Sequence, residues 1–223
     1  MAVVISATTQ AVGRLPAPVA VAVGVAALIA VMLPGSWSLL NHFGRMAHEG
    51  AHAVVGSCLG GRVVGVHLNW KERNGHTDVL TTGGGDFTTT VVGYFGPSGF
   101  GLAAAGLIAH GQIVPVLWIG VALLAILLLS MRGVFGITLV IGVGWLLLSI
   151  ARSKNAALEA VTAYALSWLL LISGIRGVRD RRDTGSGDGK TMREITGLPQ
   201  GLWYLFWLAG SVAALAWGAT MLV

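Results

Sequence analysis

The stretch from residue 36 to residue 59, SWSLLNHFGRMAHEGAHAVVGSCL, has the length of a membrane-spanning helix but an unusual content. A helix needs about 20 mostly apolar residues to cross roughly 30 Å of hydrocarbon. Side chains that are polar or ionisable are costly inside a bilayer. Among those in this stretch are Asn41, His42, Arg45, His48, Glu49 and His52. We therefore expect other helices to surround it, or a wet cavity to lie beside it.

The composition of the whole chain points to a membrane protein. Of its 223 residues, 55% are hydrophobic and only 10% are charged, and the mean hydropathy is +0.78. A water-facing surface needs about a quarter of its residues charged, so a soluble globule is excluded. We read the formal net charge of +5 as lysines and arginines held on the cytoplasmic side, and expect no nucleic-acid partner. The single cysteine, Cys58, excludes an intrachain disulfide and a cysteine metal cluster.

Further apolar windows of spanning length flank the first stretch on both sides. Together with residues 36–59 they predict an all-α polytopic membrane protein of about seven transmembrane helices, forming one domain over residues 1–223. A cleaved signal peptide is the alternative for the first window. The additional windows are Leu15–Pro34, Phe87–Ala109, Ile113–Met131, Gly133–Ile150, Ala156–Ile175 and Leu202–Val223.

Two of the connecting segments carry information of their own. Between about residues 60 and 82, alternating apolar residues, an Asn74-Gly75 turn and a returning segment predict a small β-hairpin. The segment from about 176 to 201 is basic and glycine-containing, and we interpret it as a flexible linker. With seven spans, most lysines and arginines fall on one side. This predicts a cytoplasmic N-terminus and hairpin, and a C-terminus on the opposite side.

His48-Glu49-Gly50-Ala51-His52 fits the metal-binding pattern H-E-x-x-H. On a helix, the two histidines differ by only ~40° in direction, so both imidazoles can reach one zinc ion. Glu49 can take a proton from a water activated by zinc and pass it to a leaving amine. Two imidazoles, a carboxylate and one open position favour zinc as the metal. The alternative is a buried polar cluster that binds an ion, haem or protons without hydrolysis.

This motif, the predicted hairpin and the later run Gly93-Tyr94-Phe95-Gly96-Pro97-Ser98-Gly99 together resemble the site-2-protease-like intramembrane zinc metalloproteases. Within that family, the chain is most similar to the compact bacterial branch related to sporulation-factor processing proteases. The resemblance extends over most of the chain, to Thr196-Gly197-Leu198-Pro199 and the tryptophan-bearing last helix. It implies that zinc is held by the two histidines and by an aspartate from a later Asp-Gly element.

For the third ligand the chain departs from the family's pattern, because the longer Asn- and Pro-containing motif around the family's aspartate is absent here. The chain contains one Asp-Gly pair, Asp188-Gly189, so the resemblance points to Asp188. Asp180, Asp78 and Asp86 stay open as alternatives. Under the predicted topology, His52 lies roughly 10 Å below the cytoplasmic surface. The loop that carries Asp188 would therefore have to fold inward.

The expected function is that of an intramembrane zinc metalloendopeptidase in which Glu49 activates a zinc-bound water. Its partners would be the lipid bilayer and membrane proteins or membrane-associated peptides as substrates, and the sequence identifies no regulatory partner. The alanine-, glycine- and valine-rich composition with few lysines is consistent with a bacterial cell membrane. The competing hypothesis is a non-enzymatic protein, either an inactive protease-like scaffold or a small carrier of protons or ions.

Overall fold

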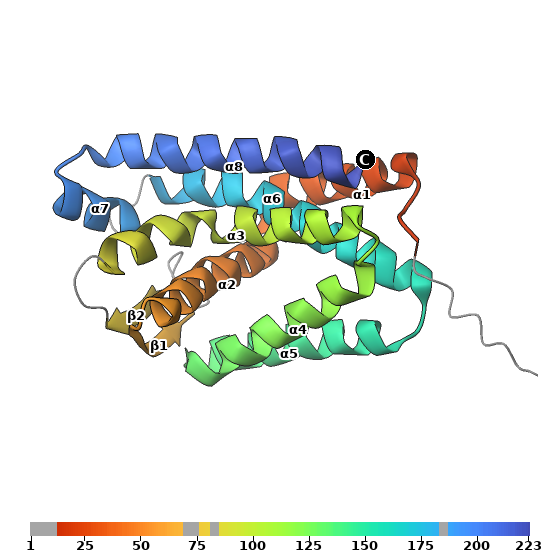
Figure 1. The fold of residues 1–223 in the computed structure, drawn as a ribbon, viewed down its shortest axis with the longest axis horizontal. Helices are drawn as coiled ribbons and strands as arrows, with labels where there is room; N and C mark the ends of the chain where they lie inside the picture. Colours follow the sequence, from red (N-terminus) through yellow and green to blue (C-terminus); the bar gives the residue numbers. More distant parts are fainter. Residues whose placement is uncertain (1–12, 69–75, 81–84, 183–186) are drawn as a thin grey trace, which may run out of the picture.

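The computed structural model describes residues 13–68, 76–80, 85–182 and 187–223. Each predicted span window falls on a helix, so the predicted helical membrane fold is confirmed. The described residues form these elements in chain order: α1 (Ala17–Met32), α2 (Pro34–Cys58), β1 (Arg62–His67), β2 (His76–Leu80), α3 (Gly85–Ala109), α4 (Ile113–Ser130), β3 (Met131–Arg132), α5 (Val134–Arg152), α6 (Ala156–Arg182), α7 (Asp188–Thr196) and α8 (Gln200–Leu222) (Figure 1).

Fewer than the predicted seven helices qualify by themselves as membrane spans. Within the described residues, five helices are each long and apolar enough to cross a bilayer: α3, α4, α5, α6 and α8. Helices α1 and α2 are long and apolar enough to cross a bilayer only when they are taken together, and this pair is bent by 104°. Pro34 explains the bend, because a proline pushes the preceding residue out of the helical region, and Leu33 is extended with ψ at 129°. The described part of the chain thus has five helices that could cross a membrane, or six spans if the bent pair counts as one.

The two ends of the described chain lie together at one end of the molecule. The Arg14 guanidinium donates a hydrogen bond from Nη2 to the carbonyl oxygen of Met221 at 2.7 Å. The hairpin strands, the junction of α4 with α5, and α7 lie at the other end (Figure 1). We therefore expect the two ends of the described chain on the same side of the membrane, whereas the sequence-based prediction counted α1 and α2 as two separate crossings and placed these ends on opposite sides.

A small sheet lies at the same end of the molecule as α7. Strands β1 and β2 pair antiparallel, with Val66 opposite Thr77, as the predicted hairpin requires. Strand β3, at the tip between α4 and α5, adds to β1 in parallel through Val66 and Met131, which was not predicted. The sheet order is β2-β1-β3. The predicted Asn74-Gly75 turn lies outside the described residues.

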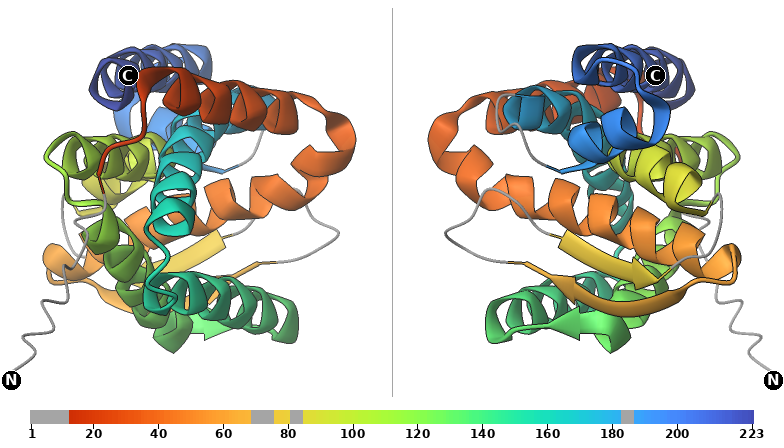
Figure 2. Two further views of the ribbon diagram at one scale, coloured as in Figure 1. Left: turned by 90° about the vertical axis from the view of Figure 1, so that its right-hand side faces the viewer. Right: turned by 90° about the vertical axis from the view of Figure 1, so that its left-hand side faces the viewer.

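Helix α3 occupies the middle of the bundle and contacts α2, α6 and α8. The main apolar core lies where α1, α3, α4 and α6 meet, and Val31, Ala105, Leu117 and Leu171 are fully buried there. Both end-on views in Figure 2 show that α2 runs between the α8 side of the bundle and the α4–α5 pair. The helix with the metal-binding motif is thus enclosed by protein on several sides, as its polar side chains require.

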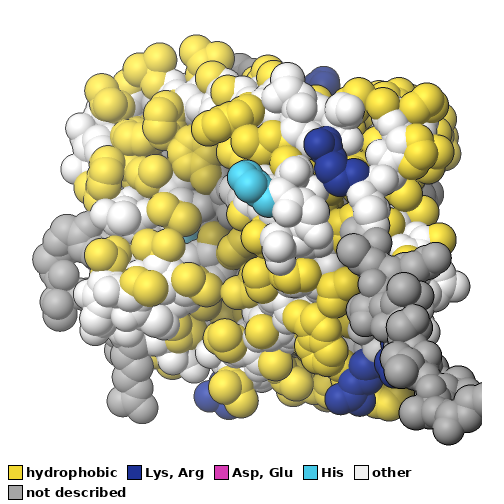
Figure 3. All heavy atoms as spheres, turned by 45° about the vertical axis from the view of Figure 1, so that its right-hand side comes forward, with side chains coloured by type: hydrophobic (Ala, Val, Ile, Leu, Met, Phe, Trp, Pro, Cys, Tyr) yellow, Lys and Arg dark blue, Asp and Glu magenta, His cyan; other side chains and the backbone are white. Residues whose placement is uncertain are grey.

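The outside of the molecule is suited to lipid. Hydrophobic side chains cover much of the face shown in Figure 3, and only a few cationic groups reach it. Large apolar residues point outward from α4, α5 and α8, among them Leu129, Val134, Trp145 and Trp217. In water such a surface would drive aggregation, whereas in a bilayer it matches the hydrocarbon.

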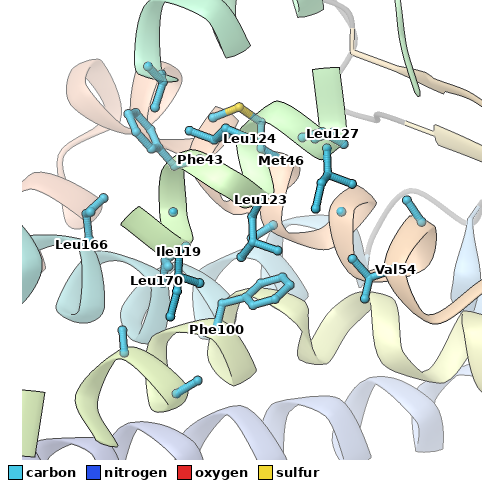
Figure 4. Close-up of a pocket in the computed structure, with 18 of the residues that line it drawn as sticks. Phe43, Met46, Val54, Phe100, Ile119, Leu123, Leu124, Leu127, Leu166 and Leu170 are labelled. Atoms are coloured by element: carbon cyan, nitrogen blue, oxygen red, sulfur yellow. The ribbon is translucent and has the colours of Figure 1, made fainter. Parts of the chain in front are cut away.

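An apolar cavity of about 460 Å³ lies between α2, α3 and α4. Phe43, Met46, Phe100 and Leu123 are among the side chains that line it (Figure 4). Gly50 also lines the cavity, and on a helix it points about 160° away from His48. Helix α2 therefore turns an apolar face to the cavity and its metal-binding motif to the opposite side.

The shared position of the two chain ends can be tested by labelling. In a Cys58→Ser background, we expect a membrane-impermeant maleimide to label Gly13→Cys and Val223→Cys from the same side of sealed vesicles. Lys190→Cys, on α7, should be labelled from the other side. Labelling of Gly13→Cys and Val223→Cys from opposite sides would contradict the fold.

Candidate metal centre

The side chains of the H-E-x-x-H motif are buried together on one face of α2. His48, Glu49 and His52 are 5%, 2% and 7% exposed. One ligand atom from each of the three lies within 4.8 Å of the other two. The histidine Nε2 atoms are 3.3 Å apart, and Glu49 Oε1 lies 4.0 Å from His48 Nε2. This His-Glu-His group could hold a metal ion.

Asp188 reaches the same point from a distant part of the chain. Its Oδ2 lies 3.2 Å from His48 Nε2 and 3.3 Å from His52 Nε2. Burial alone would raise the pKa of the Asp188 carboxyl, but the two facing imidazoles hold it below its usual range. The segment before α8 folds inward as the sequence required, and Asp188 lies beside the histidines.

These three atoms form a nearly equilateral triangle with sides of 3.2, 3.3 and 3.3 Å. A four-coordinate zinc ion with bonds of about 2.0–2.1 Å keeps its ligand atoms about 3.3–3.4 Å apart. Asp188 Oδ2 is buried, and among the described residues it faces these imidazole nitrogens. A carboxylate oxygen and two nitrogen lone pairs repel one another unless a cation or proton lies between them. The donor set and its spacing therefore fit zinc.

The neighbouring helix fixes the orientation of His52. Its Nδ1 lies 2.9 Å from the carbonyl oxygen of Thr89 on α3. A carbonyl can only accept, so Nδ1 carries the proton and donates it. With Nδ1 as the donor, a neutral His52 ring would have its Nε2 lone pair available for a metal on the side of Asp188. A hydrogen bond of this type to the outer nitrogen is the usual way in which proteins orient a metal-binding histidine.

Two glycines let α3 come close enough to make this contact. A Cβ atom on Gly93 would collide with the imidazole of His52 and would lie 3.0 Å from Asp188 Oδ2. A Cβ atom on Gly96 would lie 2.8 Å from the Cβ of Ala51 on α2. Small residues are the general means by which helices approach closely in lipid. The glycine-rich run of α3 therefore makes the space that the three candidate ligands occupy.

Helix α7 carries Asp188 at its first residue, where a negative charge is favoured by the helix dipole. Its inner face packs through Met192, which is fully buried beside Tyr94 and Trp207. The interpretation of residues 176–201 as a flexible linker is thus wrong for this part. The sequence did contain a marker for the end of a helix. Gly197 ends α7 in the left-handed conformation at φ 73°, and Pro199 follows it.

The structure places the other candidate aspartates in different surroundings. Asp180 accepts a hydrogen bond from Trp37 Nε1 at 2.7 Å and lies 3.8 Å from Arg176 Nε. Asp86 is exposed at the start of α3. Asp78 belongs to β2, and its side chain lies outside the described part of the structure. Of the three candidate aspartates whose side chains the structure describes, Asp188 is the one that lies beside the histidines.

A polytopic membrane protein with a buried His-Glu-His group of this spacing belongs to the class of membrane metallopeptidase-like proteins. The family model described as Peptidase M50B-like matches residues 21–218. The chain therefore belongs to the Peptidase M50B-like family, which is the site-2-protease family, and the predicted resemblance is confirmed. Comparisons with curated proteins and with solved structures gave no match.

The role of Gly93 gives a direct test of the site. We expect Gly93→Ala to abolish zinc binding, because the added methyl group takes the place of the His52 ring. Gly99→Ala, on the same helix, is the matched control, since a Cβ atom there meets nothing within 4 Å. Zinc per chain in the detergent-purified proteins decides the question. Full zinc content in Gly93→Ala would show that the site is built differently.

Proposed function

We propose that this protein is a zinc-dependent endopeptidase that cleaves membrane proteins or membrane-associated peptides. The triangle formed by Asp188 and the two histidines is the observation that carries the proposal. Membership of a family of membrane metalloproteases supports it. His48, His52 and Asp188 would hold the zinc. A zinc ion there would lower the pKa of water and polarise a carbonyl group.

In this proposal, Glu49 is the catalytic acid and base. Its carboxylate is almost fully buried beside the histidines, but it lies to the side of the ligand triangle. From that position it can accept a proton from the attacking water and later donate it to the amine of the leaving fragment. Glu49 therefore moves the proton, while His48, His52 and Asp188 leave one side of the triangle for the reacting groups.

The sheet supplies a way to present an extended substrate. A transmembrane helix hides its peptide bonds in its own hydrogen bonds, so it must unwind before its carbonyl groups can react. Strand β1 is paired on both sides, by β2 and β3. The outer edge of β2 is the place where a substrate strand could add to the sheet. Helix α2 contacts both β1 and β2, so a bound strand would lie near the helix with the motif.

We infer an orientation for the protein in a bacterial cell membrane from its charge. The end with α7 and the sheet carries most of the lysines and arginines, which favours the cytoplasm for this end. Arg14 and Met221 lie at the other end. The proposed cytoplasmic face is therefore still that of the hairpin, whereas the N-terminal end now faces away from the cytoplasm.

The proposed division of roles predicts different results for two substitutions. We expect Glu49→Gln to retain about one zinc per chain and to lose nearly all cleavage, because the carboxamide cannot take the proton. Asp188→Ala should lose both zinc and cleavage, with exposed Asp86→Ala as the matched control. Zinc content and cleavage of a membrane substrate in proteoliposomes measure the two effects. Full activity of Glu49→Gln would refute the mechanism.

The competing hypothesis of an inactive scaffold or an ion carrier makes a different prediction. A carrier would conduct protons or ions across liposomes, and a chelator would not reduce the flux. A zinc protease would lose cleavage on treatment with the chelator and recover it when zinc is returned. The comparison uses the same proteoliposomes for both measurements.

A further inference from the structure

The bend between α1 and α2 leaves carbonyl groups at the end of α1 that need partners from outside the regular helical pattern. Leu33 N–H donates to the carbonyl oxygen of Ile29, and Ser36 Oγ donates to that of Ala30. Arg176 of α6 donates a hydrogen bond from Nη1 to the carbonyl oxygen of Val31 at this point. Its positive charge also lies at the C-terminus of α1, where the helix dipole favours a cation.

Arg176 belongs to a group of three side chains that joins the bend to α6. The Arg176 guanidinium lies 4.6 Å from the centre of the Trp37 ring, in cation–π geometry. Trp37 Nε1 donates to Asp180 Oδ2 at 2.7 Å, and Arg176 Nε lies 3.8 Å from the same oxygen. We call Trp37, Arg176 and Asp180 the elbow brace. It connects α1 and α2 to the last turns of α6.

Residues of the elbow brace come shortly before the candidate metal ligands in both parts of the chain that carry these ligands. On α2, His48 follows Trp37 by 11 residues, or ~16 Å along the helix. On the other segment, Asp188 follows Asp180 by eight residues. Between the brace and the metal centre, Gly44 of α2 faces Ser173 of α6, where an added Cβ would lie 3.3 Å from the hydroxyl. Both segments therefore start near the brace, and their ligand-bearing residues lie together at the metal centre.

Simple leverage shows why the direction of α2 matters to the ligands. The close contact of Gly96 holds α2 near His48, and Gly44 meets α6 at Ser173. A rotation of ~3° about a point ~16 Å away moves an atom by ~0.9 Å, from the helical rise of about 1.5 Å per residue. Metal–ligand distances tolerate only about 0.2 Å. Contacts of Trp37 at the start of α2 add a fixed point far from the ligands, and this limits such a rotation.

We propose that Trp37, Arg176 and Asp180 are positioning residues for the metal centre. They fix the direction of α2 and the starting point of the segment to α7, so that the histidines and Asp188 meet at ligand distance. This role differs from the one considered for Asp180 as a zinc ligand. The inference rests on the proposed metal centre but does not depend on proteolysis.

The experiment measures the affinity of the metal-free protein for Co²⁺, whose visible absorption bands report the number and geometry of its ligands. We expect Trp37→Phe to weaken Co²⁺ binding roughly tenfold, at the lower end of the effect of outer-shell partners on metal sites. The bands should also lose intensity as the coordination becomes less regular. Phe keeps an aromatic ring beneath Arg176 but removes the donor to Asp180.

Trp168→Phe is the matched control. The Trp168 indole also donates from Nε1, to the carbonyl oxygen of Ala20 at 3.1 Å, and so ties α6 to α1 without involving α2. We expect its Co²⁺ affinity to stay within about twofold of wild type, although it too loses one hydrogen bond of about 1 kcal/mol. Equal losses of Co²⁺ affinity in the two variants would show that the brace acts only as a general structural contact, and this would overturn the proposal.

A second variant keeps the test decisive if Trp37→Phe does not fold. Asp180→Asn retains an oxygen that can accept from Trp37 but loses the ion pair with Arg176, so it should weaken Co²⁺ binding less than Asp180→Leu does. Co²⁺ binding unchanged in Asp180→Leu would overturn the brace and leave the metal centre intact. A wild-type protein that binds neither Co²⁺ nor zinc would instead overturn the metal centre itself.

Discussion

The meeting of three electron-rich atoms in an apolar interior is the constraint on which the rest of this structure depends. The Nε2 atoms of His48 and His52 and the Oδ2 atom of Asp188 lie within 3.3 Å of one another. Such an arrangement is stable only with positive charge at its centre. The surroundings keep competing atoms away, since Gly93 leaves open the space that any side chain would fill.

The two faces of α2 have opposite tasks. One face carries the ionisable residues, and α3, α6 and α7 cover them. The other face, with Phe43, Met46 and Gly50, borders the apolar cavity. A helix of this kind is neither a typical lipid-facing span nor a typical soluble core helix. Contacts with other helices determine the place of α2 in the fold. Close approaches at glycines and the elbow brace, which joins Trp37 of α2 to Arg176 and Asp180 of α6, are such contacts.

The sequence was sufficient for the features that follow from local patterns. Apolar windows located the long helices, alternating residues located β1 and β2, and the spacing of His48 and His52 indicated one shared ligand position. The bend at Leu33 was missed although Pro34 was visible, because apolar length alone does not distinguish two crossings from one bent pair. The parallel pairing of Met131 with Val66 was also out of reach, since it joins segments far apart in the chain.

The site was predictable in part for the same reason. The motif on α2 is local, whereas the position of Asp188 depends on α7, a nine-residue helix in a segment rich in glycine and charge. Its stability comes from packing Met192 against aromatic residues of α3 and α8. No periodic pattern in nine residues reveals such a partner. The same holds for Asp180, whose surroundings depend on Trp37 and thus on the bend.

The order of the ligands along the chain has a consequence for biosynthesis. Asp188 follows His48 by 140 residues, so it leaves the ribosome well after the two histidines. Helix α2 is also not apolar enough to cross a bilayer unless it is taken together with α1. It therefore depends on α3 and α6 for a stable place in the bilayer. A nascent chain that has not reached α7 lacks the third ligand of the proposed centre, so the centre cannot be complete before α7 is made.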